Sequence, residues 1–376
     1  MAFDLRWLLL VIPIAFALGW WASRLDLRQA KRDPRDAPQS YFKGLNLLLN
    51  EQHDKAIDAF IEAVQHDPDT AELHFALGNL FRRRGETERA VRVHEHLLAR
   101  GDLPASERDR AQHALAQDFF KAGLFDRAEA AYRALAGTAH ALDAEMALLS
   151  LYERSRDWAR AGEVAASLEA RGAGSFAMRR AQYLCEQALS AHAQGQANEA
   201  QALLIQAQSL APSHARARVL QGQWALQSGD AVAALQAFDG LRAANPQAFV
   251  LVAGAYAEAA LKADRVAPAA EALAQHHEQE PALALLLALN RLSPERAAER
   301  LATHLQGQPS LNAARHLLAL QDEPVAPGVM RAIDAAAKPL LRHRCAACGF
   351  EAAHYFWQCP GCLSWDSFPP RPVEEL

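Results

Sequence analysis

Residues 40–68 read SYFKGLNLLLNEQHDKAIDAFIEAVQHDP, and the spacing of small and large residues in this stretch decides the fold. Positions 8, 20, 24, 27 and 32 of a 34-residue unit are held by Gly44, Ala56, Phe60, Ala63 and Pro68. Small residues at positions 8 and 20 let two antiparallel helices approach closely, and a large side chain at position 24 fills the space between them. Proline then ends the second helix. The stretch therefore predicts a helical hairpin.

The same spacing recurs along the chain and resembles the tetratricopeptide pattern. In the next unit position 8 is held by Gly78, which is 34 residues after Gly44. Later units are marked by Leu115, Ala116, Phe119, Gly123, Ala128 and Tyr132, by Leu149, Tyr152 and Ala161, by Ala188, Gly195, Ala200, Leu204 and Pro212, and by Gly222, Gly229, Ala234, Phe238 and Pro246. Six units in near-register favour a tetratricopeptide-type superhelix over a plain helical bundle, which is the alternative.

The sequence thus predicts an all-α array over residues 38–338. Residues 282–338 keep a helical pattern without the motif, as expected of a terminal cap with a polar outer face. Stacked helix pairs form a concave inner face that typically binds peptide or protein. The side chains expected to point inward there, as candidate partner contacts, are Asn79, Arg82, Gln117 and Gln223. For each of them, an ordinary solvated helix position is the competing interpretation.

The N-terminal segment is expected to be a membrane anchor. Residues 7–22, WLLLVIPIAFALGWWA, carry no charge, and with the two preceding residues they would span about 27 Å as a helix. A cleaved signal peptide is the main rival, but its small-residue cleavage triplets would fall inside the apolar run. Five Lys/Arg follow the run and one precedes it, which places the bulk of the chain in the cytoplasm. We expect an anchor at 1–23 and a basic linker at 24–37.

The C-terminal stretch 345–362, CAACGFEAAHYFWQCPGC, has the spacing Cys-x2-Cys-x10-Cys-x2-Cys. Two such turns can aim four thiolates at one ion, so the predicted ligands are Cys345, Cys348, Cys359 and Cys362. The predicted metal-binding domain covers residues 339–376. Zinc is favoured, iron uses the same four thiolates, and a site closed by four ligands has no open position for catalysis. Cys185, by contrast, is expected in a helix core.

Other chemistry is missing from the sequence. There is no P-loop, no glycine-rich dinucleotide turn and no His-Glu-x-x-His helix, so we expect no enzymatic activity. The formal net charge is −5, and residues 342–376 carry three Lys/Arg against four Asp/Glu. Because a nucleic-acid binder normally needs a basic surface, this balance disfavours a nucleic-acid-binding ribbon.

Taken whole, the chain resembles the lipopolysaccharide assembly protein B family of Gram-negative inner-membrane proteins. The resemblance lies in YFKGLNLLLNEQHDKAIDAF, LGNLFRRRGETERAV, AGLFDRAEAAY and the ending CAACGF…YFWQCPGCLSWDSF. It implies a rubredoxin-like C-terminal domain with the four cysteines as ligands. One departure is Leu363, where turns of this type often have glycine, so a slightly strained second turn is expected.

The resemblance also implies a function. Members of the family are non-enzymatic adaptors that restrain lipopolysaccharide synthesis by promoting degradation of the deacetylase of the lipid A pathway. The degrading enzyme is a membrane-anchored AAA+ metalloprotease, and an inner-membrane regulator that senses lipopolysaccharide antagonises the adaptor. The rival hypotheses are a membrane-tethered scaffold that assembles lipopolysaccharide enzymes without directing proteolysis, a nucleic-acid binder, and an iron-containing electron-transfer protein. A homodimer is compatible with each of them.

Overall fold

The computed structural model describes residues 36–66, 70–321 and 325–376 of the 376-residue chain. The expected anchor at residues 7–22 lies outside these ranges, as does nearly all of the expected basic linker. Across the ranges that are described, no helix is both long enough and apolar enough to cross a membrane. The chain divides into two compact units, Met1–Leu151 and Tyr152–Leu376, and each is described by itself.

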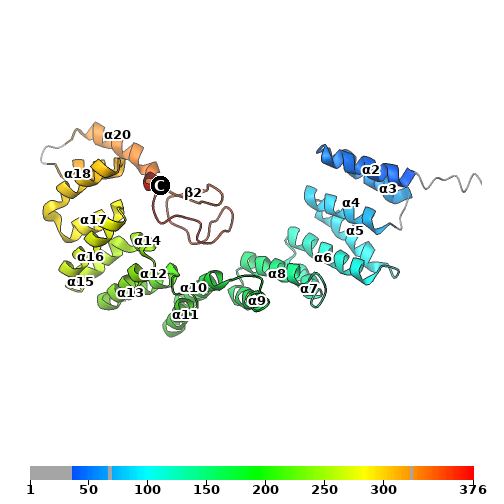
Figure 1. Cartoon of the computed structure of the whole chain (residues 1–376), viewed down its shortest axis with the longest axis horizontal. Helices are drawn as coiled ribbons and strands as arrows, with labels where there is room; N and C mark the ends of the chain where they lie inside the picture. Colours follow the sequence, from blue (N-terminus) through cyan, green and yellow to red (C-terminus); the bar gives the residue numbers. More distant parts are fainter. Residues whose placement is uncertain (1–35, 67–69, 322–324) are drawn as a thin grey trace, which may run out of the picture. The chain divides into compact units, whose positions relative to one another are not determined.

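The first unit consists of helices that pack against one another in sequence order, as the repeat pattern predicts (Figure 1). They are α2 (Asp36–Leu49), α3 (His53–His66), α4 (Ala71–Arg84), α5 (Thr87–Ala99), α6 (Ala105–Lys121), α7 (Phe125–Arg133) and most of α8 (Ala141–Ser155). The end of α8 belongs to the second unit.

The second unit continues the helical array and ends in a small two-stranded element. Its longer helices are α9 (Trp158–Ala170), α10 (Ala177–Ala193), α11 (Ala197–Leu210), α12 (Ala215–Gln227), α13 (Ala231–Ala244), α15 (Ala253–Lys262), α16 (Val266–Gln279), α17 (Leu283–Leu292), α18 (Ala297–Gly307), α19 (Leu311–Leu318) and α20 (Pro327–Ala337). The short ones are α14 (Pro246–Phe249), η1 (Val250–Val252), η2 (Pro294–Arg296), η3 (Lys338–Leu341) and η4 (Val373–Glu375). The stretch that lost the repeat motif is thus helical, as expected.

The chain then leaves the helices and forms a ribbon, which we define as residues 342–372. Strand β1 (His343–Arg344) pairs antiparallel with β2 (Glu351–Ala352). Helices α10 to α20 curve around this ribbon, so that it lies inside the bend of its own unit (Figure 1). The four residues after it, 373–376, are called the C-terminal tail.

The close approach that the sequence predicts at position 8 is present in three repeats. A Cβ built on Gly44 would lie 3.0 Å from the ring of Phe60, and one on Gly222 would lie 2.3 Å from the ring of Phe238. These glycines and rings are at positions 8 and 24 of their repeats, so each ring packs on backbone that any side chain would push away. In these two repeats the helix spacing is therefore set by the absence of a Cβ.

The second repeat has a histidine where the others have a large apolar residue. His94 is fully buried, and a Cβ on Gly78 would lie 2.5 Å from its imidazole ring. Its Nδ1 donates to Asp118 Oδ2 at 2.5 Å, and Asp118 is also fully buried. A polar ring can fill this apolar position because the next repeat supplies a buried acceptor for it.

Most buried residues elsewhere are apolar, chiefly alanine, leucine and phenylalanine. Cys185 lies in it, as expected, with no exposed surface. Burial raises the pKa of its thiol to about 12, so this cysteine stays protonated and unreactive at neutral pH.

The replacement Gly222→Ala tests the close approach. The added methyl would overlap the Phe238 ring, which is itself fully buried, so the free energy of unfolding should fall by about 1–3 kcal/mol. Gly254→Ala is the matched control, because Gly254 is an exposed helix glycine with nothing within 4 Å of a built Cβ. It should raise stability by about 0.5–1 kcal/mol. Denaturant titrations followed by circular dichroism measure both free energies. Equal stabilities of the two variants would contradict the close packing of Phe238 on Gly222.

Candidate metal centre

Two turns of the same construction bring the four cysteines together. In the first, the amide of Gly349 donates to the carbonyl of Cys345 at 2.9 Å; in the second, the amide of Leu363 donates to the carbonyl of Cys359 at 2.8 Å. Each turn starts at the first cysteine of a Cys-x-x-Cys pair and closes one residue after the second. Both thiols of a pair are therefore presented on one side of a tight loop.

The sulfur atoms are arranged as a tetrahedral ion requires. Cys345 Sγ lies 3.8 Å from Cys362 Sγ, Cys348 Sγ lies 3.7 Å from Cys359 Sγ, and all four sulfurs lie within 4.8 Å of one another. With metal–sulfur bonds of about 2.3 Å, the edge of a tetrahedron of thiolates is about 3.8 Å long. The four cysteines therefore fit one metal ion, and the geometry suits zinc and iron alike.

Two serines assist ionisation of the thiols. The hydroxyl of Ser367 lies 3.2 Å from Cys345 Sγ and lowers the pKa of that thiol to about 6. The hydroxyl of Ser364 lies 3.3 Å from Cys362 Sγ and also lowers that thiol's pKa. Because the thiolate is the metal ligand, both hydroxyls favour the form that binds. His343 takes no part in this cluster, since its Nδ1 donates to the carbonyl of Pro369 at 3.3 Å.

The two turns differ at the residue that follows each pair. Gly349 has a φ of 78°, and Leu363 in the corresponding place has a φ of 62°. Both values are left-handed, where only glycine lies without a steric penalty. The strain expected at Leu363 from the sequence is therefore present, and the hydrogen bonds of the turn hold the leucine in it.

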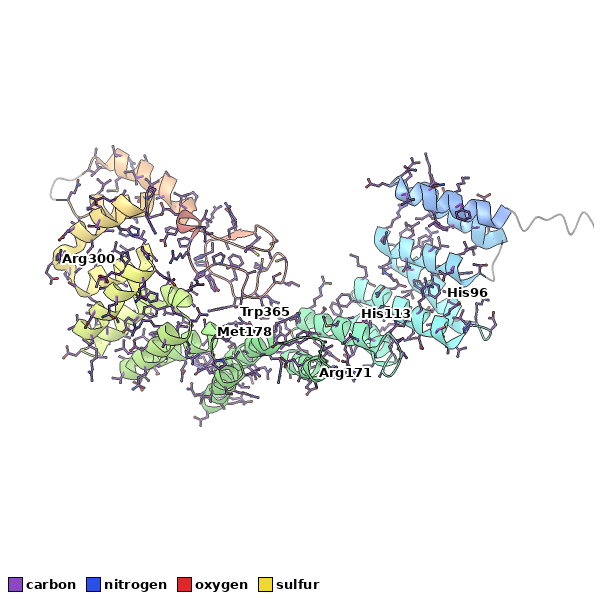
Figure 2. The ribbon with its side chains drawn as sticks, viewed as in Figure 1. His96, His113, Arg171, Met178, Arg300 and Trp365 are labelled. Atoms are coloured by element: carbon purple, nitrogen blue, oxygen red, sulfur yellow. The ribbon has the colours of Figure 1, made fainter. Side chains whose placement is uncertain are left out.

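The ribbon is packed against the repeats of its own unit. Trp365 points from the ribbon toward the helices (Figure 2), and its Nε1 donates to Glu153 Oε1 at 3.2 Å. The next residue, Asp366, accepts at Oδ1 from Gln182 Nε2 at 2.7 Å. Sequence reasoning missed this docking, because the Trp-Asp pair that follows the second Cys-x-x-Cys turn gives no sign of which helices it contacts.

The C-terminal tail is fastened to the last helices of the array. Glu374 Oε1 accepts from the amides of Leu311 and Asn312 at 2.5 and 3.1 Å, at the start of α19. Glu375 Oε1 accepts from the amide of Leu283 at 3.1 Å, at the start of α17. Carboxylates at helix N-termini satisfy free amides and complement the helix dipole. The tail therefore binds the array rather than extending into solvent.

The predicted partner contacts occupy different surroundings. Arg82 donates from Nη1 to Asp118 Oδ1 at 2.8 Å and from Nη2 to Asn79 Oδ1 at 2.5 Å, so Asn79 and Arg82 hold each other. Gln117 is half-buried, with its amide 3.5 Å from a ring nitrogen of His113. Gln223, on α12 in the second unit, is exposed. Their contact with a partner stays a prediction.

We expect one tightly held metal ion per chain. Cys345→Ser or Cys362→Ser should abolish metal binding and the ribbon's structure, because so small an element depends on its metal to fold. The helices should persist, since repeat stability is a sum of local and neighbour terms. Elemental analysis and far-ultraviolet circular dichroism measure these outcomes. Cys185→Ala, outside the cluster, is the control that should keep its metal. Metal-free wild-type protein prepared without chelators would contradict the assignment.

Leu363→Gly should strengthen the ribbon. The left-handed conformation costs a leucine roughly 1–2 kcal/mol, part of which is offset by glycine's larger entropy loss, leaving a net gain of about 0.5–1 kcal/mol. Little burial is lost, because Leu363 is 44% exposed. Release of metal to a chelator should slow accordingly. The reverse change at the corresponding position of the first turn, Gly349→Ala, should speed metal release. An unchanged rate of metal release in both variants would show that the turns are not strained.

Comparison with known proteins agrees with this architecture. The model of a rubredoxin metal binding domain matches residues 343–370, and a tetratricopeptide repeat model matches residues 43–106 and 185–249. Lipopolysaccharide assembly protein B of Escherichia coli K12 is 28% identical over 97% of this chain and 98% of its own length. The protein of that name from Haemophilus influenzae is 29% identical, with 98% of both chains covered.

Among solved structures, a tetratricopeptide repeat protein from Parabacteroides merdae matches 75% of this chain and 98% of its own, at a TM-score of 0.28 and 14% identity. So low a score carries no argument about superposition of the two superhelices. The chain thus carries stretches that match tetratricopeptide repeats and a C-terminal segment that matches a rubredoxin metal binding domain, and it is similar over almost its whole length to lipopolysaccharide assembly protein B.

Proposed function

We propose that this protein is a non-enzymatic adaptor of the bacterial inner membrane that regulates lipopolysaccharide biosynthesis. The observation that carries the proposal is the similarity to lipopolysaccharide assembly protein B, which extends over 97% of the chain and 98% of the relative. It includes the repeats and the metal-binding domain together, so the order of the parts is shared as well as the parts. Neither part supplies catalytic chemistry: the repeats form a binding array, and four thiolates would close the metal's coordination sphere.

In the proposed mechanism the protein promotes degradation of the lipid A pathway deacetylase by a membrane-anchored AAA+ metalloprotease. The adaptor supplies affinity and placement, and the protease supplies the chemistry. Residues 7–22 would anchor the chain, with its bulk on the cytoplasmic side. Tethering confines adaptor, protease and substrate to one thin layer and so raises their effective concentration. An inner-membrane regulator that senses lipopolysaccharide would act by withdrawing the adaptor from the protease.

The metal ion in this scheme is structural. Held by Cys345, Cys348, Cys359 and Cys362, it would keep the ribbon folded and in place on the helices. The C-terminal part of the ribbon is bound to the array through Trp365, and the tail that follows it is bound to α17 and α19. Loss of the metal should therefore loosen the ribbon's contacts with the binding array.

The proposal is tested by the lifetime of the deacetylase. Depleting the protein should lengthen deacetylase half-life several-fold and raise lipopolysaccharide content, because the protease loses its adaptor. The measurement is a chase of deacetylase decay after synthesis is blocked, with and without the protein.

Two variants, each expressed in cells depleted of the wild-type protein, test whether any membrane anchor suffices or whether the sequence of residues 1–23 is needed. A chain lacking residues 1–35 should fail to restore decay, whereas a chain carrying an unrelated membrane span in place of residues 1–23 should restore it. Decay that is identical with and without the protein would refute the adaptor role. A membrane-tethered scaffold that gathers lipopolysaccharide enzymes without directing proteolysis would then be the better account.

A further inference from the structure

The helices beneath the ribbon carry a recognition surface that the ribbon itself fills. We define this docking surface by five residues of the second unit: Glu153, Trp158, Gln182, Tyr183 and Arg216. They come from the end of α8, from α9, from α10 and from α12. Two consecutive ribbon residues, Trp365 and Asp366, occupy it, and the first of them is labelled in Figure 2.

One half of the docking surface accepts an aromatic side chain. Trp158 and Tyr183 stack on each other at 5.8 Å, with their planes 19° apart. The indole of Trp365 meets both edge-on, at 5.8 and 6.2 Å between ring centroids. Its ring nitrogen donates to Glu153, which already accepts from Tyr183 Oη at 2.5 Å. Trp365 is half-buried, and edge-to-face rings with the indole nitrogen bonded are a favourable arrangement for a tryptophan leaving water.

The other half accepts a carboxylate. Gln182 is fully buried, and its carbonyl oxygen accepts from Arg216 Nη1 at 3.0 Å. Because the oxygen is taken, the amide NH₂ must point outward, where it donates to Asp366 Oδ1 at 2.7 Å. Arg216 is itself 6% exposed, and Nη2 pairs with Glu186 at 2.7 Å. A fixed amide donor beside a buried guanidinium is thus directed at an acidic side chain.

The docking surface is built by the helices without help from the ribbon. The bonds that orient it, from Arg216 to Gln182 and Glu186 and from Tyr183 to Glu153, all join residues of α8, α10 and α12. The buried Nε of Arg216 has no hydrogen-bond partner in the structure, so the ribbon does not exhaust the donors of this surface. A ligand other than the ribbon could use the remaining donor.

We propose that the docking surface is a recognition site for a segment of a partner protein in which an aromatic residue is followed by an acidic one. The ribbon is then the site's occupant in cis, and the partner gains access by displacing Trp365 and Asp366. The tether gives the ribbon an effective concentration of order millimolar, so a partner must bind well or the ribbon must loosen. This inference goes beyond the proposed adaptor function and requires neither the deacetylase nor the protease.

Loss of the metal is one way to loosen the ribbon. Trp365 follows the ligand Cys362 by three residues, and Asp366 donates its amide to the carbonyl of Trp357 at 2.8 Å, inside the ribbon. The Trp-Asp pair is therefore presented only while the ribbon is folded, and folding of so small an element is coupled to metal binding. Metal-free protein should have its docking surface open.

The test uses the full chain and a fluorescent peptide with the sequence of residues 363–368, LSWDSF. Trp365→Ala keeps the four cysteines but removes the indole from the docking surface. The peptide should bind this variant about ten-fold more tightly than it binds metal-loaded wild type, as measured by fluorescence anisotropy. Chelator-treated wild type is a second way of opening the surface and should bind like the variant.

Matched controls locate the binding. In the Trp365→Ala background, Gln182→Ala should weaken peptide binding, whereas Gln194→Ala should leave it unchanged, because Gln194 is exposed at the end of the same helix. A peptide in which alanine replaces the tryptophan should not bind the open surface. Equal binding to the closed and open proteins, or binding to neither up to about 1 mM peptide, would overturn the proposal.

Discussion

The close approach of the two helices within a repeat is the constraint on which the array depends. At Gly44 and Gly222 an aromatic ring rests on bare helix backbone, at distances where a methyl group could not fit. A pair held this tightly has one register and one spacing, so every following pair starts from a defined position. The second repeat keeps the spacing with a histidine ring, and a buried aspartate of the neighbouring repeat makes that substitution possible. The buried bond from His94 to Asp118 thus adds a polar tie between two neighbouring repeats.

The ribbon is stabilised by other interactions than those that stabilise the repeats. Few of its residues are buried, and those include Cys345, Cys359 and Phe368, so apolar burial contributes little to its folding. Its order would come from four thiolates around one ion, and it comes also from the two hydrogen-bonded turns, one of which holds a leucine in the left-handed conformation. The helices give it a second support, because Trp365 and Asp366 contact groups that hydrogen bonds among the helices already orient. Metal binding and docking on the helices therefore stabilise the same set of residues and favour each other.

The sequence was sufficient for whatever depends on spacing. Glycines 34 residues apart, large rings at position 24 and the cysteine intervals each follow from local geometry, and the helical hairpins and the four-sulfur cluster are present in the structure. The strain at Leu363 was also predictable, because one residue type departs from what a tight turn needs. What could not be predicted depends on distant parts of the chain. Nothing near Arg82 indicates its bond to Asp118, and nothing near Asp366 indicates Gln182, which is 184 residues away.

The tail and the Trp-Asp pair have a mechanical consequence when taken together. Repeat arrays behave as springs, because each repeat touches only its neighbours and small rotations add along the stack. Here the polypeptide returns to its own array: the ribbon binds α8 and α10 near the beginning of the second unit, and Glu374 and Glu375 bind α19 and α17 near its end. The C-terminal segment from Trp365 to Glu375 thus connects the first helices of the second unit to its last ones. A molecule that displaced the ribbon would therefore remove this restraint on the bend of the repeats.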